Sequence, residues 1–134
     1  MRMAAREGFT MTEAETLEEA GLDVLQRLGW GDNAEIREMD EDLWRLVLRN
    51  NFGGIWSRPG LNLRDREMIV IAVLVALGAP GVTKHFKLAH KVGITDTEIR
   101  EVILQVLPYA GMPKILEAMN RFVKVRNGSE PSLE

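Results

Sequence analysis

The stretch that decides the fold is "NLRDREMIVIAVLVALG", residues 62–78. Asn62, with Asp65 three positions later, is typical of a helix start, because the asparagine side chain accepts a hydrogen bond from the first turn. From Met68 to Leu77 every residue is apolar, as in a helix that is covered on every side. Its β-branched residues would also suit a buried strand, but the start signal and the helical patterns around it favour a helix.

The rest of the chain predicts further helices and no hairpin. Thr12 with Glu15, and Thr95 with Glu98, form capping-box patterns at two helix starts. Apolar residues three and four positions apart follow both of them. The predicted helices besides the central one cover residues 12–28, 39–54, 83–92, 95–107 and 113–123. We therefore expect an all-α fold, with the glycines of "NNFGG" capping the end of the second helix.

Composition limits the classes of protein. The 134 residues suit one domain, residues 1–126, followed by a flexible polar tail, residues 127–134. The chain has no cysteine, which excludes disulfides, thiolate metal sites and thiol redox chemistry. The opening residues lack the apolar run of a secretory signal, and the longest apolar run is too short to span a membrane, so we expect a cytoplasmic protein with no membrane partner.

Charge argues against a nucleic-acid partner. Residues 1–60 hold 12 acidic and 7 basic residues, and residues 61–134 hold 8 acidic and 10 basic residues. No basic stripe with interleaved aromatic residues is present. The more basic second half would suit a small anionic ligand, although ordinary surface variation explains the difference equally well.

His85 is the first candidate for chemistry. At 100° per residue it shares the apolar face of its helix with Leu88, Ala89 and Val92. It is either a core histidine satisfied by a backbone carbonyl or a group that transfers protons near neutral pH. His90 lies about 140° away on the helix. The two are poor joint ligands for one ion, so no metal site is expected.

The segment before the central helix offers three arginines. Guanidinium groups bind carboxylates through two parallel hydrogen bonds, and this segment has three of them, on Arg58, Arg64 and Arg66. The proline after Arg58 favours an extended backbone at that residue. For two of the three we expect solvated surface charges paired with Asp65 and Glu67.

Two aromatic residues are further candidates. Trp56 is either a pocket wall or a core plug. Tyr109 lies in "PYAGMP", residues 108–113, which predicts a turn beside the core, and its hydroxyl could donate to an oxyanion.

Taken together, these motifs resemble a known family. "WSRPGLNLRDRE" leads into an apolar helix that ends in "ALG"; His85 follows, eight residues before "GITDTEIREVILQ", and "PYAGMPKILEA" comes last. Over residues 52–125 the chain resembles the carboxymuconolactone decarboxylase family, in its cysteine-free branch within the alkylhydroperoxidase D-like superfamily. Thiol peroxidases of that superfamily carry C-x-x-C-x-x-x-H. The two cysteine positions fall on Gly78 and Gly81, or on Ala79 and Val82, so peroxidase chemistry is excluded.

The resemblance implies an activity and an assembly. It implies an all-α trimer or hexamer that converts 4-carboxymuconolactone to the β-ketoadipate enol-lactone in aromatic catabolism without a cofactor. We also expect the site to be shared between subunits, because a buried helix with so little flanking chain needs neighbours to cover it. His85 would donate a proton or stabilise an oxyanion. Arg58, with Arg66 as the alternative, would bind the substrate carboxylate, and Trp56 and Tyr109 would shape the pocket.

One departure keeps other functions open. His90-Lys91-Val92 stands where the family usually has Leu-Asn-Asn, and this departure makes a related lactone or β-keto-type acid an alternative substrate. A non-catalytic oligomer that binds a small anion or a partner protein is an alternative, as is a lactone isomerase or hydrolase.

Overall fold

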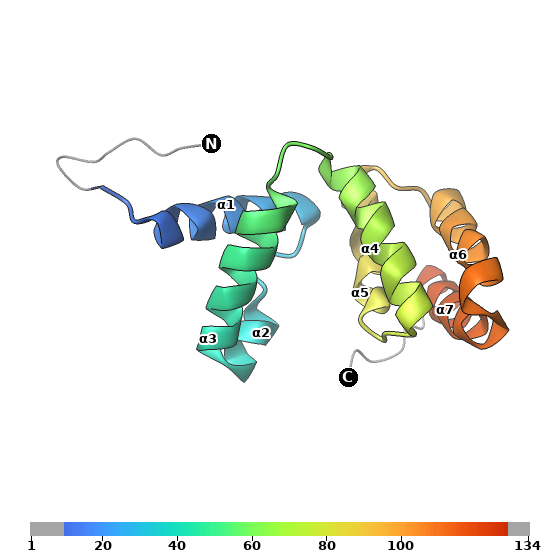
Figure 1. Cartoon of the computed structure of the whole chain (residues 1–134). Helices are drawn as coiled ribbons and strands as arrows, with labels where there is room; N and C mark the ends of the chain where they lie inside the picture. The colour runs from blue at the N-terminus through green and yellow to red at the C-terminus, as the bar shows by residue number, and fades with distance from the viewer. Residues whose placement is uncertain (1–9, 129–134) are drawn as a thin grey trace. The chain divides into compact units, whose positions relative to one another are not determined.

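The computed structural model describes residues 10–128, in which every regular element is helical (Figure 1). The chain divides into two compact units, Met1–Leu61 and Asn62–Glu134. The predicted all-α class is therefore confirmed. The opening residues 1–9, where no secretory signal was expected, and residues 129–134 of the predicted tail lie outside the described residues.

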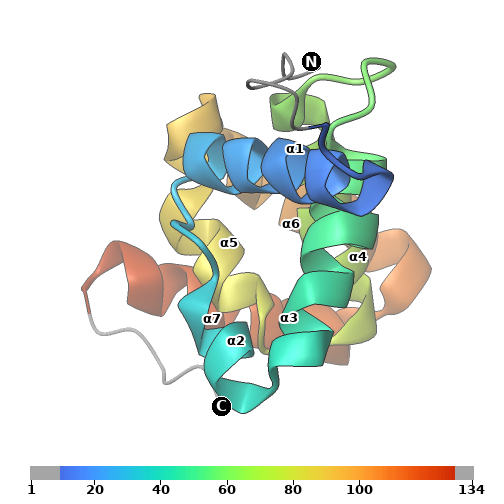
Figure 2. The same ribbon diagram turned by 90° about the vertical axis from the view of Figure 1, so that its left-hand side faces the viewer.

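The first unit is a helix packed against a bent helical rod. Its elements are α1 (Glu13–Leu28), α2 (Ala34–Met39), α3 (Glu41–Leu46) and the π-helix η1 (Val47–Trp56). α3 and η1 run on as one continuous rod that α1 crosses (Figures 1 and 2). Thr12 and Glu15 form the predicted capping box of α1.

Two glycines allow α1 and η1 to touch backbone to backbone. A Cβ on Gly53 would lie 2.1 Å from the carbonyl oxygen of Leu17, and a Cβ on Gly21 would lie 2.4 Å from that of Leu48. The expectation that Gly53 caps a helix end is therefore wrong, because this glycine lies inside η1 at the crossing. The Ser57 hydroxyl donates to the Gly53 carbonyl in the last turn.

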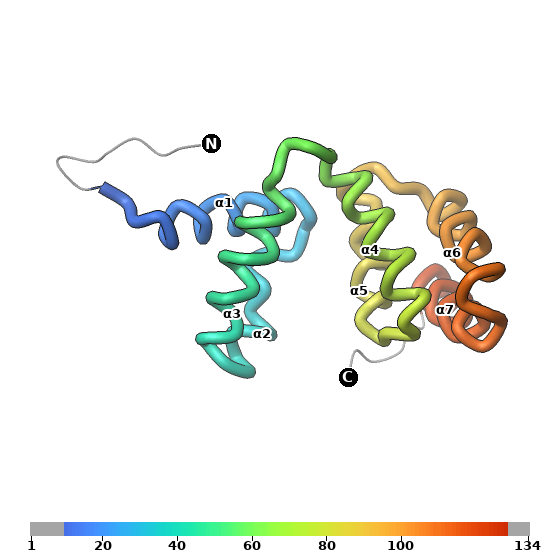
Figure 3. The backbone as a smooth tube through the Cα atoms, in the orientation of Figure 1, coloured from blue at the N-terminus to red at the C-terminus, as the bar shows by residue number. Residues whose placement is uncertain are grey.

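The second unit contains α4 (Leu63–Leu77), α5 (Val82–Leu88), the 3₁₀ helix η2 (Ala89–Val92), α6 (Asp96–Ala110) and α7 (Met112–Arg126). The tube in Figure 3 shows the path from α4 through α5 to α6 and α7. Their core is aliphatic apart from Phe86 and Phe122, whose rings meet edge to face at 5.5 Å.

The helix α4 is confirmed, but its covering is not complete. Ile71 and Val75 are buried, whereas Ile69, Val73 and Leu77 are 50%, 48% and 66% exposed. The other helices of the second unit cover one face of α4, so this unit alone does not provide the expected burial on every side.

The predicted turn at residues 108–113 is also corrected. α6 continues through Pro108 to Ala110, and the chain turns at Gly111, where φ is 88°. Pro108 has no N–H to donate to the Leu104 carbonyl, so the last turn of α6 lacks that hydrogen bond, and the positive φ at Gly111 then requires a glycine.

An ion pair joins the starts of α4 and α6. Glu98 forms the predicted capping box with Thr95, and Arg64 donates to the same carboxylate. The backbone hydrogen bond from Thr95, followed by the hydrogen bond from Arg64, holds the pKa of the Glu98 carboxyl below its usual value of 4.5. Arg64 therefore has the structural role expected for two of the three arginines, but its partner is Glu98.

We predict that Gly53→Ala destabilises the first unit by at least about 2 kcal/mol, because α1 and η1 must move apart. All three tryptophans lie in this unit, so urea unfolding followed by tryptophan fluorescence measures the change. The control is Gly60→Ala, where nothing lies within 4 Å of the added Cβ. Equal midpoints for the two variants would contradict the close crossing.

We predict that Glu98→Gln lowers stability at pH 7 and that this difference shrinks as the pH falls below 4.5. A carboxyl whose pKa is lower in the folded chain stabilises it at neutral pH and stops doing so once it is protonated. Thermal unfolding followed by circular dichroism measures both values. Glu101→Gln, on the same helix with a side chain 64% exposed, is the control. A Glu98→Gln difference that is independent of pH would refute the assignment.

Candidate active site

His85 lies on α5 with its side chain turned inward. His85 is 7% exposed, and the neighbouring core residues on α5 and η2 are Val82, Phe86 and Ala89. The predicted inward orientation is therefore confirmed. His90, by contrast, is exposed on η2.

The partner of His85 is a buried carboxylate on α4. Nδ1 of His85 lies 2.8 Å from Oε2 of Glu67, and Glu67 is only 1% exposed. The expectation that Glu67 is a surface partner of the arginines is wrong. The partner of Nδ1 is thus a carboxylate, and not the backbone carbonyl that a core histidine would be expected to bond.

A signal for this partner was present in the sequence. Glu67 precedes Ile71 and Val75 by four and eight residues, so all three fall on one face of α4. Ile71 and Val75 are 0% and 1% exposed. Glu67 therefore extends the buried stripe by one turn toward the helix start. The charged residues that precede Glu67 favour a surface position for it and make this buried stripe hard to recognise from the sequence.

The contact determines what each nitrogen of the imidazole can do. An ionised carboxylate only accepts hydrogen bonds, so with Glu67 ionised the proton of that bond belongs to Nδ1. The other ring nitrogen, Nε2, then carries a lone pair in the neutral ring and a proton in the imidazolium. Nε2 is therefore the atom through which His85 can exchange a proton with a substrate.

The second oxygen of Glu67 is unusual. Oε1 is buried and has no hydrogen-bond partner among residues 10–128. Leaving a buried acceptor unsatisfied costs about 1–3 kcal/mol, and a charged one more. Such atoms are rare in folded proteins and each calls for an explanation. If the pair only stabilised the fold, a hydrogen bond to each oxygen of Glu67 would stabilise it more.

Trp56 and Arg58 belong to the first unit. The Trp56 ring stacks on Phe52 at 5.8 Å, with 27° between the planes, at the end of η1. Arg58 is exposed just beyond this end, and its backbone N–H donates to Ile55. The structure brings His85 together with Glu67, while the assignment of Trp56 and Arg58 to the same site stays a prediction.

The remaining two candidates lie in the second unit. Arg66 is partly buried on α4, beside Glu67 in sequence, but adjacent helix residues point about 100° apart. Tyr109 is in the last turn of α6 and 85% exposed, so its expected place beside the core is wrong. Their roles toward a substrate stay predictions.

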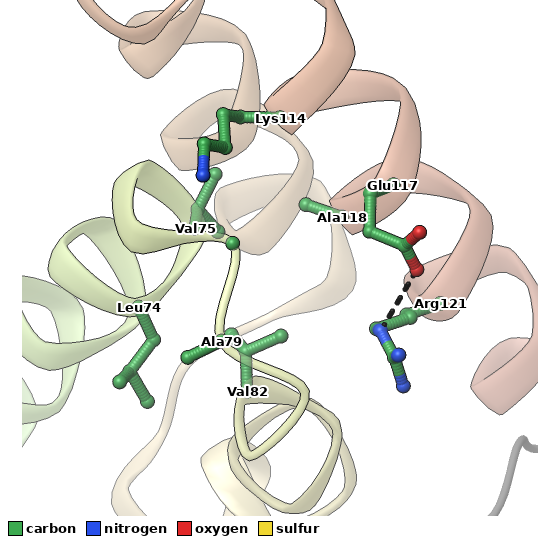
Figure 4. A pocket seen from close by; sticks show the side chains of 9 residues that line it. Leu74, Val75, Ala79, Val82, Lys114, Glu117, Ala118 and Arg121 are labelled. Carbon is green, nitrogen blue, oxygen red and sulfur yellow. Dashed lines mark ion pairs between the residues drawn. The ribbon is translucent and has the colours of Figure 1, made fainter.

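A small hollow lies where α4, α5 and α7 meet (Figure 4). Its wall includes Gly78, Ala79 and Val82, three of the four positions where the resemblance would place the cysteines of a thiol peroxidase. The sequence has no cysteine, so this wall carries no thiol.

Residues 10–128 contain neither a cluster of metal ligands nor a helix that could span a membrane. No group of three or more histidine, aspartate and glutamate side chains could hold a metal ion there. None of the helices in this part of the chain is long and apolar enough to cross a membrane.

Comparison of the sequence with known proteins places the chain in a family. The model of the carboxymuconolactone decarboxylase family matches residues 41–123, which include Glu67 and His85. The chain is 35% identical over 86 residues to 4-carboxymuconolactone decarboxylase of Acinetobacter baylyi, covering 63% of this chain and 64% of that protein. It is 33% identical over 75 residues to nitrosuccinic acid decarboxylase of Metarhizium robertsii, covering 55% and 52%. The chain therefore spans less than two thirds of either relative, yet the family model covers more than half of the chain itself. On that match, the chain belongs to the carboxymuconolactone decarboxylase family.

Proposed function

We propose that the protein is a cofactor-independent decarboxylase of a small, activated carboxylic acid, with 4-carboxymuconolactone as its substrate in aromatic catabolism. The observation that carries the proposal is the buried contact between His85 Nδ1 and Glu67 Oε2 at 2.8 Å. The names of the two relatives, both decarboxylases, support the class of reaction.

The chemistry of the substrate defines what the site has to supply. When the C–C bond to the carboxylate breaks, CO₂ leaves and its electron pair remains on carbon. In 4-carboxymuconolactone that pair spreads to the lactone carbonyl as a dienolate, and in nitrosuccinic acid a nitro group would take it as a nitronate. Both substrates therefore provide their own electron acceptor. The protein has to bind an anion, stabilise the new oxyanion and protonate carbon.

The pair of His85 and Glu67 supplies the proton in this proposal. The imidazolium gives its Nε2 proton to a carbon of the substrate, and a C–H bond forms. The neutral imidazole of His85 keeps the proton on Nδ1, which stays hydrogen-bonded to the Glu67 carboxylate. A proton from solvent then restores the imidazolium, so that each turnover consumes one proton. Glu67 stays ionised throughout, holding the ring in one orientation.

The other parts of the site remain within the proposal. Arg58, or Arg66 in its place, binds a carboxylate of the substrate, while Trp56 and Tyr109 shape the pocket. A cytoplasmic homotrimer or homohexamer with shared sites is the assembly we infer. The apolar side chains that α4 leaves exposed, Ile69, Val73 and Leu77, support a covered interface.

His90, Lys91 and Val92 favour testing more than one substrate. They replace the Leu-Asn-Asn that the family resemblance led us to expect, and His90 and Lys91 are exposed on η2. The panel should therefore include nitrosuccinic acid and other small lactone acids. Mass spectrometry of the products separates loss of CO₂ from the gain of water by a hydrolase and from the unchanged mass of an isomer.

We predict that the protein releases CO₂ from 4-carboxymuconolactone without added metal and, in D₂O, places one deuterium on the carbon α to the lactone carbonyl, where protonation of the dienolate gives the enol-lactone. His85→Gln should lower kcat at least about 100-fold, because the proton donor is gone. The matched control is His90→Gln, which should stay within about twofold, because an exposed histidine outside the pair has no part in the step. Circular dichroism checks that both variants fold. A folded His85→Gln protein with undiminished kcat would refute the role.

A further inference from the structure

The short helix that carries His85 is held from two sides. α5 has seven residues, and its N-cap, Gly81, has no side chain with which to cap it. Helices of this length are not stable by themselves, so contacts with other elements fix their position. His85 contacts Glu67 on α4, and Thr83 contacts Arg121 on α7.

The second contact involves a fully buried hydroxyl. Thr83 is 0% exposed, and its Oγ1 accepts a hydrogen bond from Nη1 of Arg121 at 3.2 Å. Thr83 and His85 are two residues apart, which places them about 200° apart around the helix. The two contacts therefore lie on opposite sides of α5 and together fix its rotation.

Arg121 is itself held in place. Its Nε lies 3.0 Å from Oε2 of Glu117 one turn earlier on α7, and its side chain is 17% exposed (Figure 4). The planar guanidinium can serve both partners at once, Nε toward Glu117 and Nη1 toward Thr83. A preorganised donor of this kind constrains a short helix more than a mobile lysine would.

We infer that Arg121, oriented by Glu117, is a positioning residue for His85: through Thr83 it fixes the rotation of α5 and so keeps Nδ1 on Glu67. The inference rests on the proposed function in giving His85 the proton transfer. Arg121 acts on the reaction only through the placement of α5.

The test compares Thr83→Val, Arg121→Met and the control Arg126→Met. Thr83→Val keeps the shape of the side chain and removes the acceptor. Arg126 lies on the same helix, and its contacts are an ion pair with Asp96 at 3.9 Å and the Phe122 ring. Two readouts are used: ¹⁵N NMR of the His85 imidazole, and kcat with KM separately.

We expect wild type and Arg126→Met to show one His85 tautomer with a slowly exchanging Nδ1 proton. In Thr83→Val and Arg121→Met the Nδ1 proton should exchange fast with solvent, or the His85 ring should populate both tautomers. Their kcat should fall about tenfold or more with KM within about twofold, because the proton donor is displaced. If Arg121→Met fails to fold, Thr83→Val decides the question.

A Thr83→Val protein that is less stable but has the wild-type His85 spectrum would overturn the inference, because the contact would then be merely structural. So would an altered spectrum with wild-type kcat. The spectra need no turnover. A changed spectrum in a protein inactive on every substrate tested would thus support the positioning of His85 and count against the proposed function alone.

Discussion

The hydrogen bond between His85 and Glu67 is the contact that most constrains how α4 and α5 lie in the second unit. It joins residues 18 positions apart, on α4 and α5, with both side chains almost fully removed from water. Burying a carboxylate is expensive unless a partner compensates it, and removing one partner of such a pair costs several kcal/mol. α4 and α5 must therefore hold fixed positions for the pair to exist. The apolar core around Ile71, Val75 and Phe86 provides that rigidity.

The same burial gives the pair its chemical value. Hydrogen bonds and charges act more strongly where water is excluded, so a proton donor held in one orientation loses little energy to reorganisation. One oxygen of Glu67 makes the bond to His85, and the other has no partner among the described residues. A decarboxylase whose substrate accepts its own electron pair needs little more from the protein than binding, a placed proton and a dry site. In the proposed reaction, the buried pair of the second unit would supply the placed proton.

The sequence predicted most of the helices, because their signals are local. The capping boxes at Thr12 and Thr95 set two helix starts correctly, and the period of apolar residues turned His85 inward. The errors came from long-range packing. The sequence around Gly53 is typical of a helix end, but the glycine lies where two backbones meet, and no local pattern distinguishes these roles. The charged neighbours of Glu67 predict a surface position, and they outweigh its alignment with Ile71 and Val75. The partners of Arg64 and Thr83 lie 34 and 38 residues away, beyond the reach of any helical period.

The most direct test of the central claim is whether His85 and Glu67 act as one unit in decarboxylation. We would measure kcat for CO₂ release by wild type, Glu67→Gln, His85→Gln and the double variant, each shown to be folded by circular dichroism. Residues that share one step give strongly non-additive losses. We predict that each single variant loses most of the activity and that the double variant is no slower than His85→Gln alone. Losses that multiply in the double variant, or a Glu67→Gln protein as fast as wild type, would contradict the account.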